Sequence, residues 1–168
     1  MAAPQSWVSV NLATETVDEA AHNIQLRGVD VATVEQLMQA GLAHHPVFVF
    51  DIASSASDPK HFARNLSAFC TSSGVTETGS TAVGLVKEAL KSEFATVASD
   101  ITQRDIMIGG VPGLETSYEL NSGLEDIREA QLEVLPKPNV VCVVSLAYTP
   151  AEGAGNVLGV AAATAQFP

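Results

Sequence analysis

Residues 139–148, NVVCVVSLAY, form the most hydrophobic segment of the chain and contain Cys142, one of its two cysteines. A strand with one wet face alternates apolar and polar residues, whereas this segment is apolar at almost every position. Such a run is typical of a strand that is covered on both faces. The segment therefore predicts the central strand of a sheet. Because free cysteine packs as a small hydrophobic residue, Cys142 is expected in the core.

Other segments have the alternation or the β-branched composition of strands. They are SWVSVNLA (6–13), VFVFDIA (47–53), NLSAFCTSS (65–73), ITQRDIMI (101–108), LETSYEL (114–120) and REAQLEVL (128–135). In the last of these, Glu129, Gln131 and Glu133 alternate with apolar residues, which predicts one solvent-facing side. The segment 65–73 is expected to lie beside the central strand.

The clearest helix is predicted over TAVGLVKEALKSEFATVA (81–98), with Ser80 as its N-cap. Its apolar residues fall at intervals of three or four and form one stripe, which consists of Val83, Val86, Leu90, Phe94 and Val97. Further helices are predicted over 30–42, capped by Asp30, and over 157–167, and residues 16–26 are expected to form a short helix or a loop. A turn is expected around Asp58 and Pro59.

The elements follow one another as strand, helix, two strands, helix, about four strands and helix. Short turns between strands imply antiparallel pairing, and helices separated from the strand runs imply an α+β class. We therefore expect an α+β fold with a single antiparallel β-sheet and helices packed on its faces. The chain has no internal repeat or Pro/Ser-rich linker, so residues 1–168 are expected to form a single domain.

The charge balance is acidic, with 19 Asp and Glu against 8 Lys and Arg and a net charge of −11. Binding to nucleic acid or to anionic lipid depends on basic residues, so these partners are not expected. No run of about 18 apolar residues predicts a membrane span. The start MAAPQSWVSV lacks the features of a signal peptide. We expect a cytoplasmic protein as the chain stands, or an envelope or secreted protein if a leader has been removed.

The two cysteines, Cys70 and Cys142, leave two interpretations open. Valines flank Cys142, which favours two buried and unreactive thiols over a reactive cysteine. A single disulfide is the alternative, and it would suit an exported protein. Neither cysteine has the close spacing to further cysteines or histidines that a metal site requires.

The remaining candidate groups predict no catalytic, cofactor-binding or metal site. The histidines His22, His44, His45 and His61 match no metal motif and are expected to be solvated, and Asp51 and Asp58 follow a strand and cap a turn. The GGVPG segment (109–113) precedes a strand, so it predicts a hairpin turn rather than a phosphate loop. The GAGN segment (153–156) predicts a loop that caps the last helix, and Glu125, Asp126 and Glu129 predict a solvated face.

The order of these segments resembles the PsbP-like superfamily. The resemblance extends from Trp7 to Phe167 and is carried by SWVSV, VFVFDI, NLSAF, the amphipathic helix, IGGVPGLETSYEL, EAQLEVL, VVCVVSLAY and the closing helix. Within that superfamily the chain is most similar to the actinobacterial LpqN and LpqT lipoproteins, although it has no lipobox leader. The resemblance implies α/β/α layers and a role in binding other proteins, and it implies no site residues.

The function expected from the sequence is a non-enzymatic protein-binding or adaptor domain, with a protein partner of unknown identity and no cofactor. Two alternatives remain. One is a small-molecule binding or carrier protein with a pocket between sheet and helices. The other is an enzyme whose site is assembled from distant residues. A concave pocket with perturbed ionisable groups would favour the enzyme, an apolar cavity the carrier, and an exposed apolar patch the binding domain.

Overall fold

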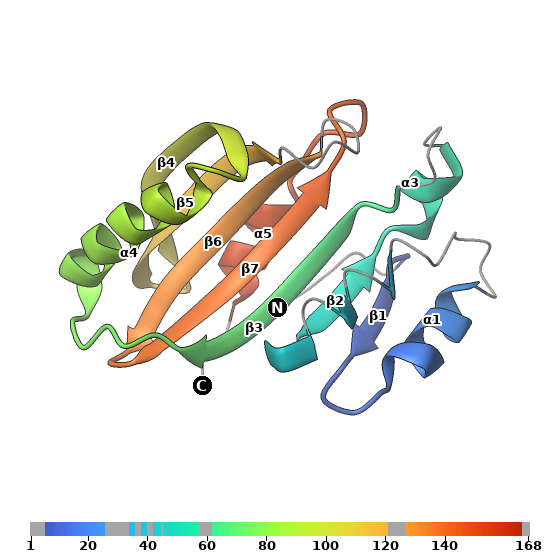
Figure 1. Cartoon of the computed structure of the whole chain (residues 1–168), viewed down its shortest axis with the longest axis horizontal. Helices are drawn as coiled ribbons and strands as arrows, with labels where there is room; N and C mark the ends of the chain where they lie inside the picture. The colour runs from blue at the N-terminus through green and yellow to red at the C-terminus, as the bar shows by residue number, and fades with distance from the viewer. Residues whose placement is uncertain are drawn as a thin grey trace.

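The computed structural model describes residues 6–25, 34–35, 38–39, 42–44, 46–57, 62–120 and 127–165. The seven strands, four α-helices and one 3₁₀ helix of this part follow the chain in the order shown in Figure 1. The elements are β1 (Val8–Asn11), α1 (Val17–Gln25), η1 (Leu42–His44), β2 (Val47–Phe50), α3 (Ile52–Ser57), β3 (Asn65–Ser72), α4 (Gly79–Phe94), β4 (Ala98–Ile108), β5 (Val111–Leu120), β6 (Arg128–Lys137), β7 (Val140–Tyr148) and α5 (Val157–Thr164).

The described strands form one sheet of seven strands in the order β1-β2-β3-β7-β6-β5-β4. Every neighbouring pair is antiparallel, which confirms the α+β fold with a single antiparallel sheet. Strand β7, the segment with which the sequence analysis began, has three strands on either side and is the central strand. Strand β3 pairs with it, as predicted. No helix in the described part of the chain is both long and apolar enough to cross a membrane.

Helices cover both faces of the sheet. Successive side chains of a strand point to opposite faces, so one strand can contribute buried residues to both sides. On one face, Leu158 and Ala161 of α5 pack against alternate residues of β6 and β7, such as Leu132 and Leu146. Helix α5 lies behind the sheet in Figure 1, and α4 lies in front of β4 and β5. On this front face, the ring of Phe94 of α4 packs in a tilted arrangement on Tyr118 of β5, with 4.3 Å between the ring centroids.

The first two strands have a packing cluster of their own on the face that carries α4. Phe48 and Phe50 of β2 point to this face and contact the buried side of α1, where Ala20 and Ile24 are fully buried. Val49, between the two phenylalanines, points to the opposite face and joins the cluster under α5. The segment 30–42, where a helix was predicted, is described only in part. Its residues Val34 and Met38 are buried in the cluster with α1. The predicted cap, Asp30, lies outside the described residues.

The β4–β5 hairpin turns through Gly109 and Gly110, whose φ angles are +55° and +82°. Two consecutive positive φ angles in a two-residue loop define the type I′ turn that suits the twist of a hairpin, and glycine adopts them without strain. The hairpin predicted for the GGVPG segment is therefore confirmed.

Four local predictions are wrong. Helix α4 begins after Thr78 rather than Ser80, and Thr78 makes no side-chain capping bond. The helix ends at Phe94, so Val97 lies beyond it and is 49% exposed instead of belonging to the apolar stripe. Residues 52–57 form helix α3 where a strand end and a turn were expected. Glu133 of β6, which was placed on a solvent-facing side, is only 3% exposed because α4 lies over that side of the sheet.

Candidate functional site

A pocket of about 540 Å³ lies between the first turns of α4 and the β4–β5 hairpin. Its wall consists of Ser80, Val83, Asp105, Ile106, Met107, Pro112 and Gly113. Most of this lining is apolar, although it lies at the edge of the sheet. Met107 is the most exposed of the large hydrophobic residues in the described chain, at 62%. The pocket therefore presents apolar surface to solvent.

The shape of this pocket follows from the close packing at Gly113. A Cβ atom at Gly113 would lie 2.6 Å from Cδ1 of Ile108 and 2.8 Å from the carbonyl oxygen of Glu133. Only glycine allows the hairpin to approach β6 this closely. Ile108 fills the space beside Gly113 and is itself buried.

Polar contacts hold α4 over β4 at the border of the pocket. Lys87 of α4 donates from Nζ to Oδ1 of Asp105 at 3.0 Å. Gln103 of β4 donates from its side-chain amide to the backbone oxygen of Lys87 at 3.3 Å. An apolar recess with a charged rim is the arrangement found at protein-binding surfaces.

A buried polar group lies deeper under α4, on the same face of β5 and β6. The Thr116 hydroxyl donates to Oε2 of Glu133 at 3.4 Å, and Oε1 of Glu133 has no partner among the described residues. Burial, with a smaller contribution from the neighbouring charge of Glu129, raises the pKa of the Glu133 carboxyl from 4.5 to about 8. The side chain is therefore largely protonated at neutral pH.

Tyr118 and Gln131 extend this polar group along the sheet. The Gln131 amide donates to the Tyr118 hydroxyl oxygen at 2.7 Å and to Oε1 of Glu129 at 2.8 Å. Burial, followed by the charge of Glu129, raises the pKa of the Tyr118 hydroxyl above its ordinary range. The Glu133 carboxyl and the Tyr118 hydroxyl thus keep their protons at neutral pH, and hydrogen bonds of this group link β5 to β6.

A second polar cluster lies at another end of the sheet and centres on Arg64. Its guanidinium donates to Oδ2 of Asp51 at 2.6 Å and to the backbone oxygen of Gly153 at 3.3 Å, and it lies 5.2 Å from the ring centroid of Trp7. Asp51 is buried. Four segments that are distant in sequence meet at this one side chain, which indicates a structural role.

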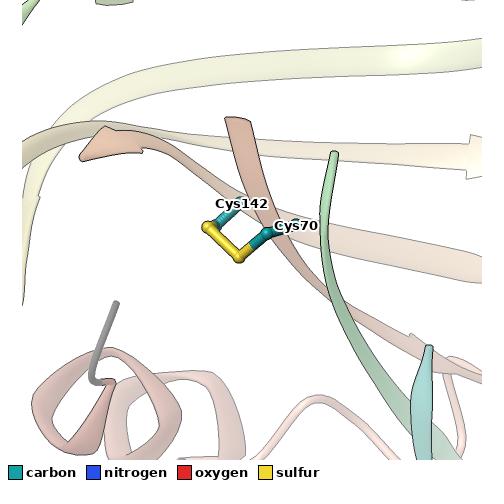
Figure 2. Close-up of a disulfide and its surroundings, with 2 residues drawn as sticks. All are labelled: Cys70 and Cys142. Atoms are coloured by element: carbon teal, nitrogen blue, oxygen red, sulfur yellow. A yellow bond between two sulfur atoms is a disulfide. The ribbon is translucent and has the colours of Figure 1, made fainter. Parts of the chain in front are cut away.

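The two cysteines form a disulfide between β3 and β7, shown in Figure 2. The preferred prediction of two buried thiols is therefore wrong, and the alternative of one disulfide is correct. Cys142 is buried, as expected of the central strand, whereas Cys70 is exposed. Direct pairing of the two residues across neighbouring strands brings their sulfur atoms together, and this register could not be read from the sequence.

The remaining predicted positions come together in no site within the described residues. His22 is exposed on α1, and His44 belongs to η1, whereas His45, Asp58 and His61 lie outside the described residues. No group of three potential metal ligands occurs in the part of the chain that the structure describes.

Of the acidic residues expected on a solvated face, Glu125 and Asp126 lie outside the described residues, and Glu129 is half-buried beside Gln131. Asn156 occupies the N-cap position of α5 but makes no side-chain capping bond, although its backbone oxygen accepts the first hydrogen bond of the helix from Val160. Of the residues that line the pocket, Val83 was predicted only as part of the apolar stripe of α4 and Pro112 only as part of the hairpin turn, and Met107 was not singled out. The one available signal was Met107, an apolar residue on the side of β4 that otherwise carries Gln103 and Asp105.

The similarity of this chain to known proteins comes from a solved structure and not from a family model or a curated protein. No protein-family model and no curated protein matches the chain. The chain is similar to a solved structure, a protein of unknown function named PA94 from Pseudomonas aeruginosa. The two are 16% identical, the similarity covers 63% of this chain and 74% of that chain, and the TM-score is 0.49.

Proposed function

We propose that this chain is a non-enzymatic protein-binding domain and that it binds its partner on the surface formed by α4 and the β4–β5 hairpin. The observation that carries the proposal is the apolar pocket beside an exposed Met107 at the outer strand of the sheet. Exposed apolar surface of this kind marks binding sites, because a soluble protein otherwise covers it. Protein binding is also the role that the resemblance to the PsbP-like superfamily implies.

The chemistry of the pocket suits an apolar side chain of a partner. Val83 and Pro112 offer rigid apolar walls, and the flexible thioether of Met107 adapts to differently shaped partners. Asp105 and Lys87 lie at the border, where they can meet polar groups around such an anchor. An apolar anchor within a polar rim is how a small interface gains most of its affinity.

The residue with the strongest sign of an active site is Glu133, and its position favours a structural role. A raised carboxyl pKa marks a candidate acid or base when the group can reach a substrate. Glu133 is 3% exposed and does not line the pocket, so a bound molecule there would not touch it. Asp51, the other buried acidic residue described above, forms an ion pair with Arg64, which also favours a structural role.

A small apolar molecule is the second candidate ligand, and the same pocket favours it. Pockets that hold small ligands typically enclose about 300–1,000 Å³ and combine apolar walls with a few polar groups. The pocket of about 540 Å³ falls in this range, with Ser80 and Asp105 as its polar groups. A carrier function would use the same residues as the proposed protein interface.

The disulfide supports an oxidising compartment as the place of action. Disulfides persist in extracellular and envelope proteins and are rare in the reducing cytosol. We therefore favour, of the two localisations expected from the sequence, the envelope or secreted one. Thiol labelling of the protein in its own cells, with and without reductant, would test this point.

The proposal can be tested with a photo-crosslinking amino acid placed at Ser80 or at Ser92. Both serines are exposed on α4, but only Ser80 lines the pocket. In cells that produce the protein, we expect Ser80 to yield a covalent adduct with one other protein, and Ser92 to yield none. Mass spectrometry of the adduct identifies the partner.

Replacement of Val83 by Asp in the Ser80 crosslinking variant should abolish the adduct, because it places a charge in the apolar wall. Circular dichroism must show that this variant folds. The protein-binding proposal would be wrong if Ser80 and Ser92 gave the same adducts, or if Ser80 gave none. An adduct with a lipid or another small molecule would favour the carrier function instead.

A further inference from the structure

The outer strand β4 has an open edge that no other described strand covers. It is 11 residues long and pairs with β5 alone among the described strands. A bulge follows Ser99, where Asp100 has a φ of +51°, but residues 102–108 pair with β5 without interruption. A regular edge of this length can accept a further strand.

The turn at Gly109 and Gly110 determines which backbone groups face this edge. In a two-residue hairpin the residues that flank the turn, here Ile108 and Val111, form a hydrogen-bonded pair, and the pairs then alternate along the strands. Met107, Asp105 and Gln103 therefore direct their N–H and C=O groups away from β5. Ile101, beyond them, lies next to the bulge.

Strand β4 has few of the features that normally prevent an open edge from pairing with another strand. Natural proteins place lysine, proline or an unpaired charge there to prevent pairing. Residues 101–108 contain no lysine or proline, and both charges are neutralised within the chain. Arg104 bonds to Oε2 of Glu115 at 2.7 Å, and Asp105 bonds to Lys87 at 3.0 Å.

We propose that β4 pairs with β4 of a second copy of this chain, antiparallel and centred on Arg104, so that two sheets join into one. A two-fold axis requires a surface that complements itself. In this register Ile101 faces Met107 of the second copy, and Gln103 faces Asp105. Apolar residues thus meet apolar ones, and the free N–H of the Gln103 amide can donate to a carboxylate. About eight backbone hydrogen bonds form between the copies.

The neighbouring symmetric registers are less favourable. Pairing centred on Asp105 places the apolar Met107 against the polar Gln103 and Ile101 against Gly109 of the turn, so no two apolar residues of this face meet. Pairing centred on Gln103 places the apolar Ile101 against Asp105. Pairing centred on Arg104 does bring two guanidinium groups together, but each already has Glu115 as a partner.

Pairing of this kind would also change the pocket. Both α4 helices would lie on the same face of the joined sheet, and Ile101 of one copy would pack beside Met107 of the other. The second copy would then add an apolar residue to the border of the pocket. The interface is small, so we expect a dissociation constant in the micromolar range. The dimer does not depend on the proposed partner and would form in the purified protein.

Two cysteine variants of the full chain test the pairing and its register. At the two-fold axis the two copies of residue 104 face each other at about 4.5–5.5 Å between Cα atoms, close enough for a disulfide. Two copies of residue 102 would be about 13 Å apart along the strands. Thr102 and Arg104 are both exposed on the same side of β4. We expect Arg104→Cys to form a covalent dimer under mild oxidation and Thr102→Cys to remain monomeric.

Sedimentation of the unmodified protein and two lysine variants provides a second test. Met107→Lys should raise the dimer dissociation constant at least tenfold, because it places a charge in the apolar pair. Leu85→Lys, which changes an exposed residue on the outer side of α4, should leave it unchanged. A protein that remains monomeric at about 100 μM, or equal crosslinking of the two cysteine variants, would overturn the proposal. Peptide mapping must place the new bond between two copies of residue 104.

Discussion

Cys70 of β3 and Cys142 of β7 lie directly opposite each other and are joined by a disulfide that spans 72 residues of the sequence. The bond ties together the two halves of the sheet, since β1 and β2 reach the remaining strands only through β3. It also places a covalent link in the central strand. The stability of the fold should therefore depend on the oxidation state of this pair.

The double variant Cys70→Ala/Cys142→Ala should be less stable than the oxidised protein by about 4 kcal/mol, because the disulfide restricts a long loop in the unfolded chain. Urea unfolding of both proteins would measure the difference. Reduction of the native protein should lower its unfolding midpoint by a similar amount. The double variant is the control, since reductant should not change its midpoint. Equal midpoints for the oxidised and reduced native protein would contradict the prediction.

The buried Glu133 carboxyl should make the protein less stable as the pH rises. Its pKa is raised from 4.5 to about 8 in the folded state, so between these values the folded protein keeps a proton that the unfolded chain has lost. The free energy of unfolding then falls by roughly 1.4 kcal/mol for each pH unit in that interval and levels off above pH 8. Urea titrations between pH 5 and about pH 9 would record this slope.

Glu133→Gln should remove most of this slope, because the amide does not titrate and has nearly the same shape. Glu119→Gln serves as the matched control, since Glu119 is another glutamate of the sheet, pairs with Arg128 and lies on the opposite face of β5 from Thr116. It should retain the slope of the native protein. If Glu133→Gln kept the full pH dependence, another group would be responsible.

The pattern of the sequence was sufficient to predict the order of the elements and the central position of β7. These properties depend on local periodicity: NVVCVVSLAY is apolar on both faces, and the glycines of GGVPG require a turn. The position of the segment 65–73 beside the central strand was also predicted, and β3 does pair with β7. What local pattern cannot determine is which helix covers a given part of the sheet.

That limit explains the errors at particular residues. Glu133 alternates with apolar neighbours as a solvent-facing residue would, and only the position of α4 buries it. Val97 has the correct spacing for the stripe of α4, but the helix ends three residues earlier. The pocket depends on the approach of α4 to the hairpin, and the disulfide depends on register. The burial of Glu133, the pocket and the disulfide are tertiary properties, and no segment of the sequence encodes them alone.

Arg64 and Asp51 should be strongly coupled. Removal of the guanidinium in Arg64→Met leaves the buried Asp51 carboxylate without its ion pair, and breaking such a pair typically costs about 3–5 kcal/mol. Asp51→Asn alone should cost a similar amount, and the double variant should cost clearly less than the sum of the two. Urea unfolding of the four proteins gives the coupling energy. Additive effects would show that the contact contributes little.

Trp7 offers an independent readout of the same cluster. It is the only tryptophan of the chain, and the Arg64 guanidinium lies 5.2 Å from its ring centroid. The fluorescence of the folded protein should therefore change in Arg64→Met. Lys91→Met, which removes an exposed cation of α4 that pairs with Glu88, is the control and should leave the spectrum unchanged. A spectrum unaffected by Arg64→Met would place the guanidinium elsewhere.

Two glycine-to-alanine variants should change the stability in opposite directions. At Gly113 a Cβ atom would lie 2.6 Å from Ile108 and 2.8 Å from a backbone oxygen of β6, so the hairpin must move. We expect Gly113→Ala to lower the free energy of unfolding by about 1–3 kcal/mol, as overpacking of a core does.

At Gly84, in the middle of α4, the new methyl group would meet no atom within 4 Å. Gly84→Ala should therefore stabilise the protein by about 0.5–1 kcal/mol through helix propensity. Thermal unfolding of both variants separates the two effects, and a neutral Gly113→Ala would mean that β5 and β6 are not packed this closely.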